Sequence, residues 1–238
     1  MNRESRGEIK EFYARCARAQ RIPMVEVDDE FEQIVYQVLA NLVEGDEPDA
    51  YSVVGDDVYI IEHFQFNASR ENRRGSSLSR KLAEANKNDS GSITYIETES
   101  NAQNYVNNLI KHFENHAKKY DQYKANVQKI VGNEKNIKGL FFLIEDITLF
   151  GAVEVSELQP FKIILTTEFM NIWKQYDCVK CIVLAGRCQN EDYCEIYSNK
   201  CTEIKCDSIN NKTIIIMNKA FQRTYTYEIK IQGDVNHG

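Results

Sequence analysis

The chain has 238 residues, of which 42% are apolar and 27% charged, and its formal net charge at pH 7 is −7. The length fits one domain with or without an appendage, and the composition excludes a wholly disordered, collagen-like or low-complexity chain. No apolar run of about 18 residues occurs, and the charged N-terminal segment lacks the apolar middle of a signal peptide, so we expect a cytoplasmic protein without a membrane partner.

Charge is unevenly distributed along the chain. Residues 22–66 contain 12 Asp or Glu and no Lys or Arg. Twelve carboxylates without a local cation repel one another unless they are exposed to solvent, paired with cations from distant parts of the chain or bound to a metal ion. Solvated acidic turns explain such a block equally well, and both interpretations stay open.

Two amphipathic helices are predicted before residue 45. Apolar residues recur at helical spacing over about 4–19 and again from Asp29. Asp29 and Glu32 have the spacing of a capping box, with Asp in place of Ser or Thr. The second apolar stripe reaches Leu42, and Gly45 can end that helix.

A β-hairpin is predicted next. Residues 49–54 and 57–66 are rich in β-branched and aromatic residues, and Gly55-Asp56 between them has the character of a two-residue turn. The polar stretch over 67–100 predicts a loop with one short strand near Ile93.

A heptad-like apolar stripe from Val106 to Ile130 predicts a long helix, continuous or broken, that Gly132 ends. His116 lies within this stripe, and we expect it at the edge of the core. If the stripe is exposed, it can bind a partner helix or a second copy of the chain; if buried, it is only core.

The remaining residues predict a sheet. Residues 137–147 are apolar on both faces until Glu145 and Asp146, which predicts a central strand. A helix from Thr166 and a buried strand over 179–185 follow, and then antiparallel strands over 193–197, 213–217 and 225–231.

These elements predict one α/β or α+β domain with a mixed central sheet flanked by helices. An N-terminal helical segment (1–27) precedes a core (28–187), which contains a long helical insertion (about 67–136). A C-terminal extension of antiparallel strands (188–238) completes the chain.

Pro48-Asp49 opens the first hairpin strand, and Glu62 lies in the second, with 12 residues between Asp49 and Glu62. This pattern, with the order of elements over about half of the chain, resembles the PD-(D/E)xK nuclease-like superfamily. That family has a restriction-endonuclease-like αβββαβ core. Its motif is Pro-Asp, a gap of roughly ten to thirty residues, and then Glu or Asp, any residue and Lys.

The resemblance implies a divalent-metal-dependent nuclease that hydrolyses phosphodiesters of DNA or RNA. Asp49 and Glu62 would hold Mg²⁺ or Mn²⁺, with Glu30 or Glu32 on the first core helix as a further ligand. In a second register, Glu62 takes the first position and Glu145 or Asp146 the second.

The motif departs from the family at its lysine, which is Phe64 here. Alternation along a strand places residues 62 and 64 on one face and residues 63 and 65 on the other. A catalytic cation would therefore come from elsewhere, with Lys174 as the first candidate and Lys138 as a weaker one. A catalytically inactive interaction protein on the same fold is the alternative.

Two further features concern partners and cofactors. Five basic residues in a Ser-, Asn- and Gly-rich segment predict contact with nucleic acid: Arg70, Arg73, Arg74, Arg80 and Lys81. Six of the seven cysteines lie between Cys178 and Cys206, and four thiolates can hold zinc. Zinc is the less favoured cofactor, because Cys181 lies in an apolar run and the later spacings do not repeat the C-x-x-C.

Overall fold

The computed structural model describes residues 24–25, 29–68, 71–72, 75–76, 93–100, 102–147, 167–188, 191–199 and 223–230. The chain divides into two compact units, Met1–Phe66 with Ile110–Ser208 and Asn67–Leu109 with Ile209–Gly238. The helix predicted over about 4–19 and the strand predicted over 213–217 lie outside the described residues.

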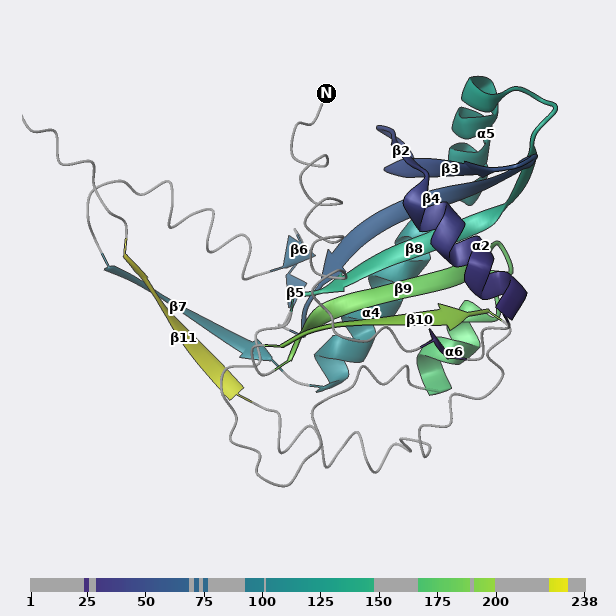
Figure 1. The fold of residues 1–238 in the computed structure, drawn as a ribbon. Helices are drawn as coiled ribbons and strands as arrows, with labels where there is room; N and C mark the ends of the chain where they lie inside the picture. The colour runs from purple at the N-terminus through teal and green to yellow at the C-terminus, as the bar shows by residue number, and fades with distance from the viewer. Residues whose placement is uncertain are drawn as a thin grey trace, which may run out of the picture. The chain divides into compact units, whose positions relative to one another are not determined.

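The first unit is built on a seven-stranded mixed sheet of order β1-β10-β9-β8-β4-β3-β2 (Figure 1). Its strands are β1 (Met24–Val25), β2 (Leu42–Glu44), β3 (Ala50–Val54), β4 (Asp57–Phe66), β8 (Asn136–Asp146), β9 (Val179–Cys188) and β10 (Glu191–Ser198). Strands β2, β3 and β4 form an antiparallel meander, and β8 and β9 continue the sheet parallel to β4. Strand β10 returns antiparallel to β9, and the short β1 pairs parallel with β10. The α/β class with a mixed central sheet is thus confirmed.

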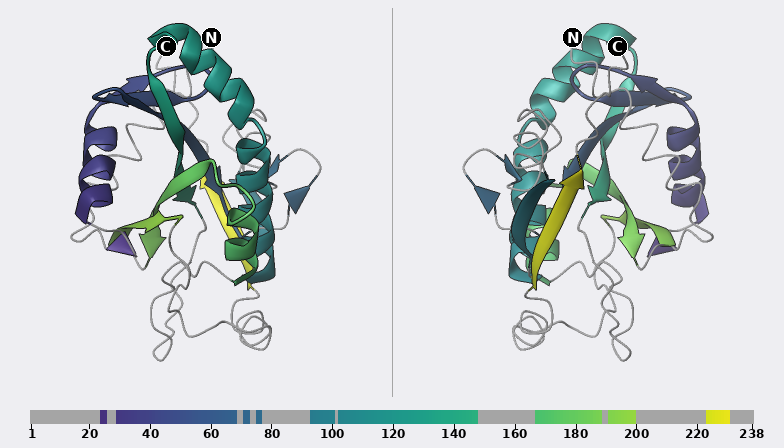
Figure 2. Two further views of the ribbon diagram at one scale, coloured as in Figure 1. Left: turned by 90° about the vertical axis from the view of Figure 1, so that its right-hand side faces the viewer. Right: turned by 90° about the vertical axis from the view of Figure 1, so that its left-hand side faces the viewer.

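Helices cover both faces of this sheet, as Figure 2 shows. The helices are α2 (Asp29–Ala40), α4 (Ala102–Ala117), α5 (Tyr120–Val131) and α6 (Thr167–Trp173), and α4 enters the first unit at Ile110. Val35 and Val38 of α2 pack on one face with Ile61, Phe141 and Val183. Among the described residues, no helix is long and apolar enough to cross a membrane.

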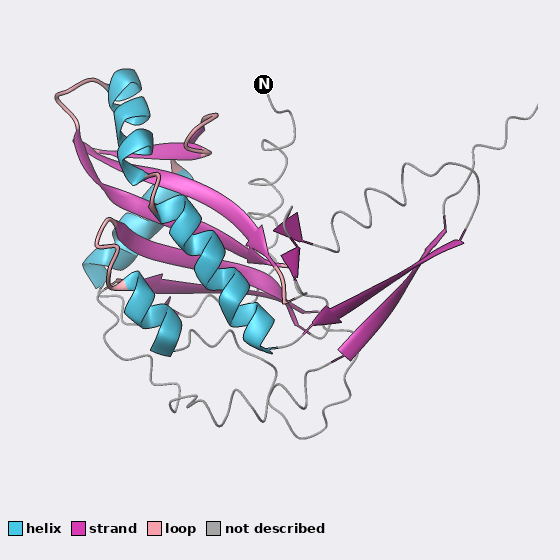
Figure 3. Ribbon diagram, turned by 180° about the vertical axis from the view of Figure 1, so that it is seen from behind, coloured by secondary structure: helices cyan, strands magenta, loops and turns pink. Residues whose placement is uncertain are grey.

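The other helices lie on the opposite face of the sheet (Figure 3), and aromatic rings join them to it. The ring of Phe113 on α4 meets Phe142 of β8 and Phe169 of α6 edge-on, each at a centroid distance of 5.1 Å. Because strand side chains alternate, Glu62 and Phe64 belong to this face, whereas Ile61 and His63 belong to the α2 face.

The hairpin of β3 and β4 follows the predicted boundaries closely. Val54 pairs with Asp57 across the two-residue turn, and Gly55 has φ +64°. An L side chain rarely adopts this conformation, which explains a glycine at this turn. The turn fixes the register of the hairpin and places Ala50 opposite Ile61.

Two predicted helices end differently in the structure. Helix α2 ends at Ala40, and Leu42–Glu44 form β2, because these residues pair with β3 instead of extending the helix to Gly45. The long helical stretch is broken: the main-chain N–H of Lys119 bonds to His116, three residues back, before α5 begins at Tyr120.

The second unit contains two small sheets. Strand β7 (Ile93–Ser100) pairs antiparallel with β11 (Arg223–Lys230), and β5 (Glu71–Asn72) pairs with β6 (Gly75–Ser76). The strand predicted over 225–231 is therefore real, but its partner is β7, 123 residues earlier at the Ser100–Arg223 pair. In the same unit the Asn108 side chain donates to the main-chain oxygen of Asn67 at 2.8 Å.

Candidate functional site

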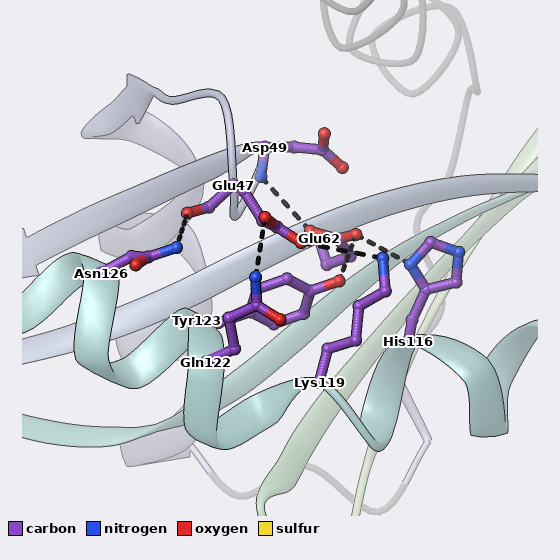
Figure 4. Close-up of polar contacts among 8 residues, drawn as sticks. All are labelled: Glu47, Asp49, Glu62, His116, Lys119, Gln122, Tyr123 and Asn126. Carbon is purple, nitrogen blue, oxygen red and sulfur yellow. Dashed lines mark hydrogen bonds and ion pairs between the residues drawn. The ribbon is translucent and has the colours of Figure 1, made fainter.

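Asp49 and Glu62 lie side by side where the β3–β4 hairpin opens. The main-chain N–H of Asp49 donates to Glu62 Oε2 at 3.3 Å (Figure 4). In return, Asp49 Oδ2 accepts the main-chain N–H of His63 at 2.8 Å. The first pair of acids that the motif singles out is therefore brought together, through main-chain donors that tie the two residues to each other.

The Glu62 side chain is buried beneath α4 and α5, with 8% of its surface exposed. Its Oε1 accepts the hydroxyl of Tyr123 at 2.7 Å and lies 2.7 Å from His116 Nδ1. With the N–H of Asp49 on Oε2, this carboxylate has three hydrogen-bonding partners, which offset the cost of burying it.

The electrostatics of Asp49 differ from those of an exposed acid. Burial, and next the charge of Glu62, raise the pKa of Asp49 from its ordinary 3.8 to about 6, although the N–H of His63 and the charges of His63 and His116 oppose this. The neighbouring acids therefore repel each other at neutral pH, and a cation between them would relieve that repulsion.

Burial, together with the hydrogen bond to Glu62, also raises the pKa of the Tyr123 hydroxyl. The phenol therefore keeps its proton at neutral pH and remains a donor to Glu62.

Phe64, which stands at the motif's lysine position, forms a stacking surface. The His116 ring lies on it at a centroid distance of 4.8 Å, with 10° between the planes, and His112 lies on it at 6.1 Å. A stacked ring and a carboxylate thus hold the His116 imidazole from two directions.

Helix α5 and the residue before it hold the turn that precedes Asp49. Gln122 donates to Glu47 Oε2 at 3.0 Å, and Asn126 donates to the main-chain oxygen of Glu47 at 3.0 Å. Lys119 Nζ lies 3.8 Å from Glu47 Oε1 and 5.9 Å from the centre of the Tyr123 ring. These contacts place Lys119 beside the acidic pair.

The motif did not point to the α4–α5 side of the site. His116, Lys119, Tyr123 and Asn126 follow one another at intervals of three and four residues, so they share one side of the helical stretch. The sequence does place these polar residues at and beside the apolar stripe of the helical stretch. The stripe by itself predicts which side of the helices is buried, but it does not identify a carboxylate as their partner.

The acids at the end of β8 lie apart from this pair. Glu145 pairs in register with Gln65, accepts its side-chain N–H at 2.8 Å and lies 3.6 Å from His63 Nε2, all on the α2 face. Asp146 pairs with Phe66 and so shares the face of Glu62, but four residues further along β4, which is about 13 Å. The structure therefore brings Asp49 to Glu62 and brings neither Glu145 nor Asp146 to them.

The remaining predicted site residues are separate from the pair or outside the described residues. Glu30 is exposed on α2, and Lys174 is exposed just after α6. Lys138 lies 3.3 Å from Asp57 at the opposite end of β4. The five basic residues over 70–81 are outside the described part of the chain.

The cysteines that the structure describes with their side chains are Cys178, Cys181 and Cys194, and all three are free thiols. Cys181 and Cys194 belong to the apolar cluster beneath α2. Burial raises the pKa of both Cys178 and Cys181, which disfavours the thiolate that zinc requires.

The side chains at this site supply part of the ligand set that a hard divalent cation requires. Asp49 and Glu62 offer carboxylate oxygens of the type that Mg²⁺ and Mn²⁺ prefer. Within the described residues, no group of three or more His, Cys, Asp or Glu side chains is arranged to hold a metal ion. Water, substrate or both would therefore have to complete the coordination.

No family model, curated protein or solved structure matches this chain. Any indication of its function therefore comes from the positions of its own residues.

Tyr123→Phe is expected to lower the free energy of unfolding by about 1.5–3 kcal/mol, because the change keeps the buried ring and removes a hydroxyl donor to the buried carboxylate of Glu62. Urea denaturation at pH 7 measures the change. Tyr120→Phe, at the first residue of the same helix, is the matched control, for which a change below about 0.5 kcal/mol is expected. Equal effects of the two variants would show that the bond to Glu62 contributes nothing.

Proposed function

We propose that this protein is a PD-(D/E)xK-like phosphodiesterase that uses a divalent cation to hydrolyse nucleic acid. The order of elements supports the proposal: a helix (α2), three antiparallel strands (β2, β3, β4), a helical connection (α4, α5) and a parallel strand (β8) correspond to the αβββαβ order of that superfamily, with β5, β6 and β7 inserted between β4 and α4. Pro48-Asp49 immediately precedes the second of the three strands, and Glu62 lies in the third.

The observation that carries the proposal is the juxtaposition of Asp49 and Glu62. The main-chain N–H of Asp49 donates to the carboxylate of Glu62, and the charge of Glu62, after burial, raises the pKa of Asp49. Such repulsion is a cost to the folded protein unless a cation is bound there, so acids held in this way favour a cation-binding role.

In this proposal Asp49 and Glu62 hold Mg²⁺ or Mn²⁺, Glu62 through Oε2, because Tyr123 and His116 lie at Oε1. The bound cation would polarise the phosphodiester and make a bound water more acidic. Glu47, Gln122 and Asn126 keep the turn before Asp49 in place. Lys119 supplies positive charge beside the acids, where a phosphate would approach.

The test combines metal binding with cleavage. Mn²⁺ binding is measured by calorimetry, and cleavage is measured on end-labelled single- and double-stranded DNA and RNA with Mg²⁺ or Mn²⁺. Glu62→Gln and Glu62→Ala are expected to weaken Mn²⁺ binding at least tenfold and to slow cleavage at least a hundredfold. Losing one of the two proposed carboxylate ligands removes a negative charge and a donor oxygen from the cation site.

Glu114→Gln is the matched control. Glu114 is a part-buried carboxylate on α4 that accepts the hydroxyl of Tyr176 at 3.2 Å, away from the Asp49–Glu62 pair. Its variant should bind Mn²⁺ and cleave as the wild type does. Equal metal affinity of wild type and Glu62→Ala would remove Glu62 from any cation site.

A catalytically inactive, nuclease-like interaction protein is the second candidate. The observations that favour it are Phe64 at the lysine position and the three partners that already satisfy Glu62. This candidate predicts that the wild type cleaves no DNA or RNA with any divalent cation. It also predicts that binding of a partner, with nucleic acid as the first to try, survives Asp49→Ala.

A further inference from the structure

His116 is anchored from two sides and accessible on a third. Its Nδ1 lies 2.7 Å from Glu62 Oε1, and its ring stacks on Phe64 at 4.8 Å. Of its side-chain surface, 22% is exposed, compared with 8% for Glu62. The buried acid and the partly exposed imidazole therefore form an oriented pair, which Figure 4 shows together with Tyr123 and Asp49.

Hydrogen bonding fixes which ring nitrogen carries the proton. Tyr123 already donates its hydroxyl proton to Glu62 Oε1 at 2.7 Å. A carboxylate oxygen has no proton to give, so the short contact with His116 requires the proton to sit on Nδ1. In the neutral imidazole, Nε2 then has a free lone pair, and the partner on Nδ1 sets this arrangement.

Three parts of the fold hold this geometry. His116 and the Phe113 ring, one turn earlier on α4, both face the sheet, and Phe113 is fully buried. Glu62 comes from β4, and Tyr123 comes from α5. An imidazole oriented by a carboxylate, with its second nitrogen free, is the arrangement that proteins use for proton transfer near neutral pH.

We propose that His116 is a catalytic residue of this site, the base that takes a proton from the water attacking a nucleic-acid phosphodiester. The inference rests on the proposed function. It gives His116 the catalytic role that the family's lysine would have at the position of Phe64. The water oxygen forms a bond to phosphorus while its proton passes to His116 Nε2. The bond from phosphorus to the leaving oxygen breaks, and that oxygen takes a proton from a second water.

Glu62 thus has two roles, one for each oxygen. Oε1 orients His116 and keeps the proton on Nδ1, and Oε2, on the side of Asp49, is the oxygen available to a cation. Phe64 holds the plane of the imidazole and leaves Nε2 at its edge. A phenylalanine at this position is consistent with a base supplied by a stacked histidine from α4.

The first experiment determines which nitrogen of the His116 ring carries the proton, in the absence of cation and substrate. In the ¹⁵N spectrum of the full-length protein, the neutral His116 ring should carry its proton on Nδ1. In Glu62→Ala the ring should relax to a mixture of both tautomers, and His112 should not change. A wild-type proton on Nε2 overturns the inference, whatever the protein cleaves.

The second experiment follows cleavage at saturating Mn²⁺. His116→Asn should lower kcat at least a hundredfold, the lower end of what a general base contributes, and leave Mn²⁺ affinity within twofold of wild type. Added imidazole should restore part of its rate.

His112→Asn is the matched control, because His112 also stacks on Phe64, one turn earlier on α4. It should cleave as the wild type does. Unchanged cleavage in His116→Asn overturns the inference and leaves the proposed function intact. No cleavage by the wild type with any cation overturns both.

Discussion

Asp49→Asn is expected to abolish cation-dependent cleavage and, in the absence of metal, to make the protein more stable at pH 7. Both results follow from losing one carboxylate charge, which burial and next the charge of Glu62 disfavour in the folded protein and which a bound cation would need. The amide keeps an oxygen that can accept the N–H of His63 and loses the charge that burial and Glu62 disfavour.

The pH dependence follows from the raised pKa of Asp49, about 6 in the folded protein and 3.8 as its ordinary value. Between these values the folded protein holds a proton that the unfolded chain has lost, so this group stabilises the fold fully below pH 3.8, and the contribution is lost as pH rises through 6. The difference corresponds to a ceiling of about 3 kcal/mol.

Urea denaturation with a chelator present, at steps from pH 4 to pH 7.5, measures the effect. Wild type should lose stability relative to Asp49→Asn as pH rises, and at pH 7 the variant should be more stable by about 1–3 kcal/mol. Saturating Mn²⁺ should raise the melting temperature of the wild type and leave the variant unchanged, because a ligand stabilises only the fold that binds it.

Asp57→Asn is the matched control for this experiment. Asp57 begins β4 and lies 3.3 Å from Lys138, at the end of the strand away from Glu62. Its variant should show the wild-type dependence on pH and on Mn²⁺, with a change in stability below about 1 kcal/mol. Parallel curves for wild type and Asp49→Asn would mean that neither burial nor Glu62 disfavours the Asp49 charge in the folded protein.

Phe113→Ala should lower the free energy of unfolding by about 3–5 kcal/mol, the usual cost of deleting a fully buried phenylalanine. The Phe113 ring is 0% exposed and meets the rings of Phe142, Phe169 and Tyr176 edge-on, at 5.1, 5.1 and 5.7 Å. It therefore joins α4 to β8 and α6.

Denaturation at pH 7 measures the loss, and Ile130→Ala is the control. Ile130 lies near the end of α5 and is 62% exposed, so its truncation should change stability by less than about 0.5 kcal/mol. Because His116 lies one turn beyond Phe113, the Phe113 variant should also weaken the Nδ1–H preference of the His116 ring. An intact preference together with the full loss of stability would show that Glu62 alone orients His116.

Local patterns predicted much of the fold. Two runs rich in β-branched and aromatic residues and a two-residue turn at Gly55-Asp56 were enough to predict the hairpin, and the length of the turn fixes the register that the structure shows. The apolar run before Glu145 predicted a central strand, and β8 lies between β4 and β9.

Long-range pairing could not be predicted in the same way. Residues 42–44 continue the apolar stripe of α2, but they form β2 because β3 offers them an open edge. Likewise, the strand near the C-terminus was recognised by its alternation, although nothing local identifies β7 as its partner. Such pairings depend on contacts far apart in the chain, where local propensity carries no information.

The same distinction between local and long-range contacts applies to the candidate site. The sequence by itself determined that Asp49 lies beside Glu62 and that Glu62 and Phe64 share a face, since both follow from the geometry of one hairpin. Only the tertiary structure decided that His116 and Tyr123, 54 and 61 residues beyond Glu62, reach its carboxylate, and that Glu145 binds on the other face. The packing of α4 and α5 on the sheet sets those contacts, and helix packing depends on the whole core, not on any short motif.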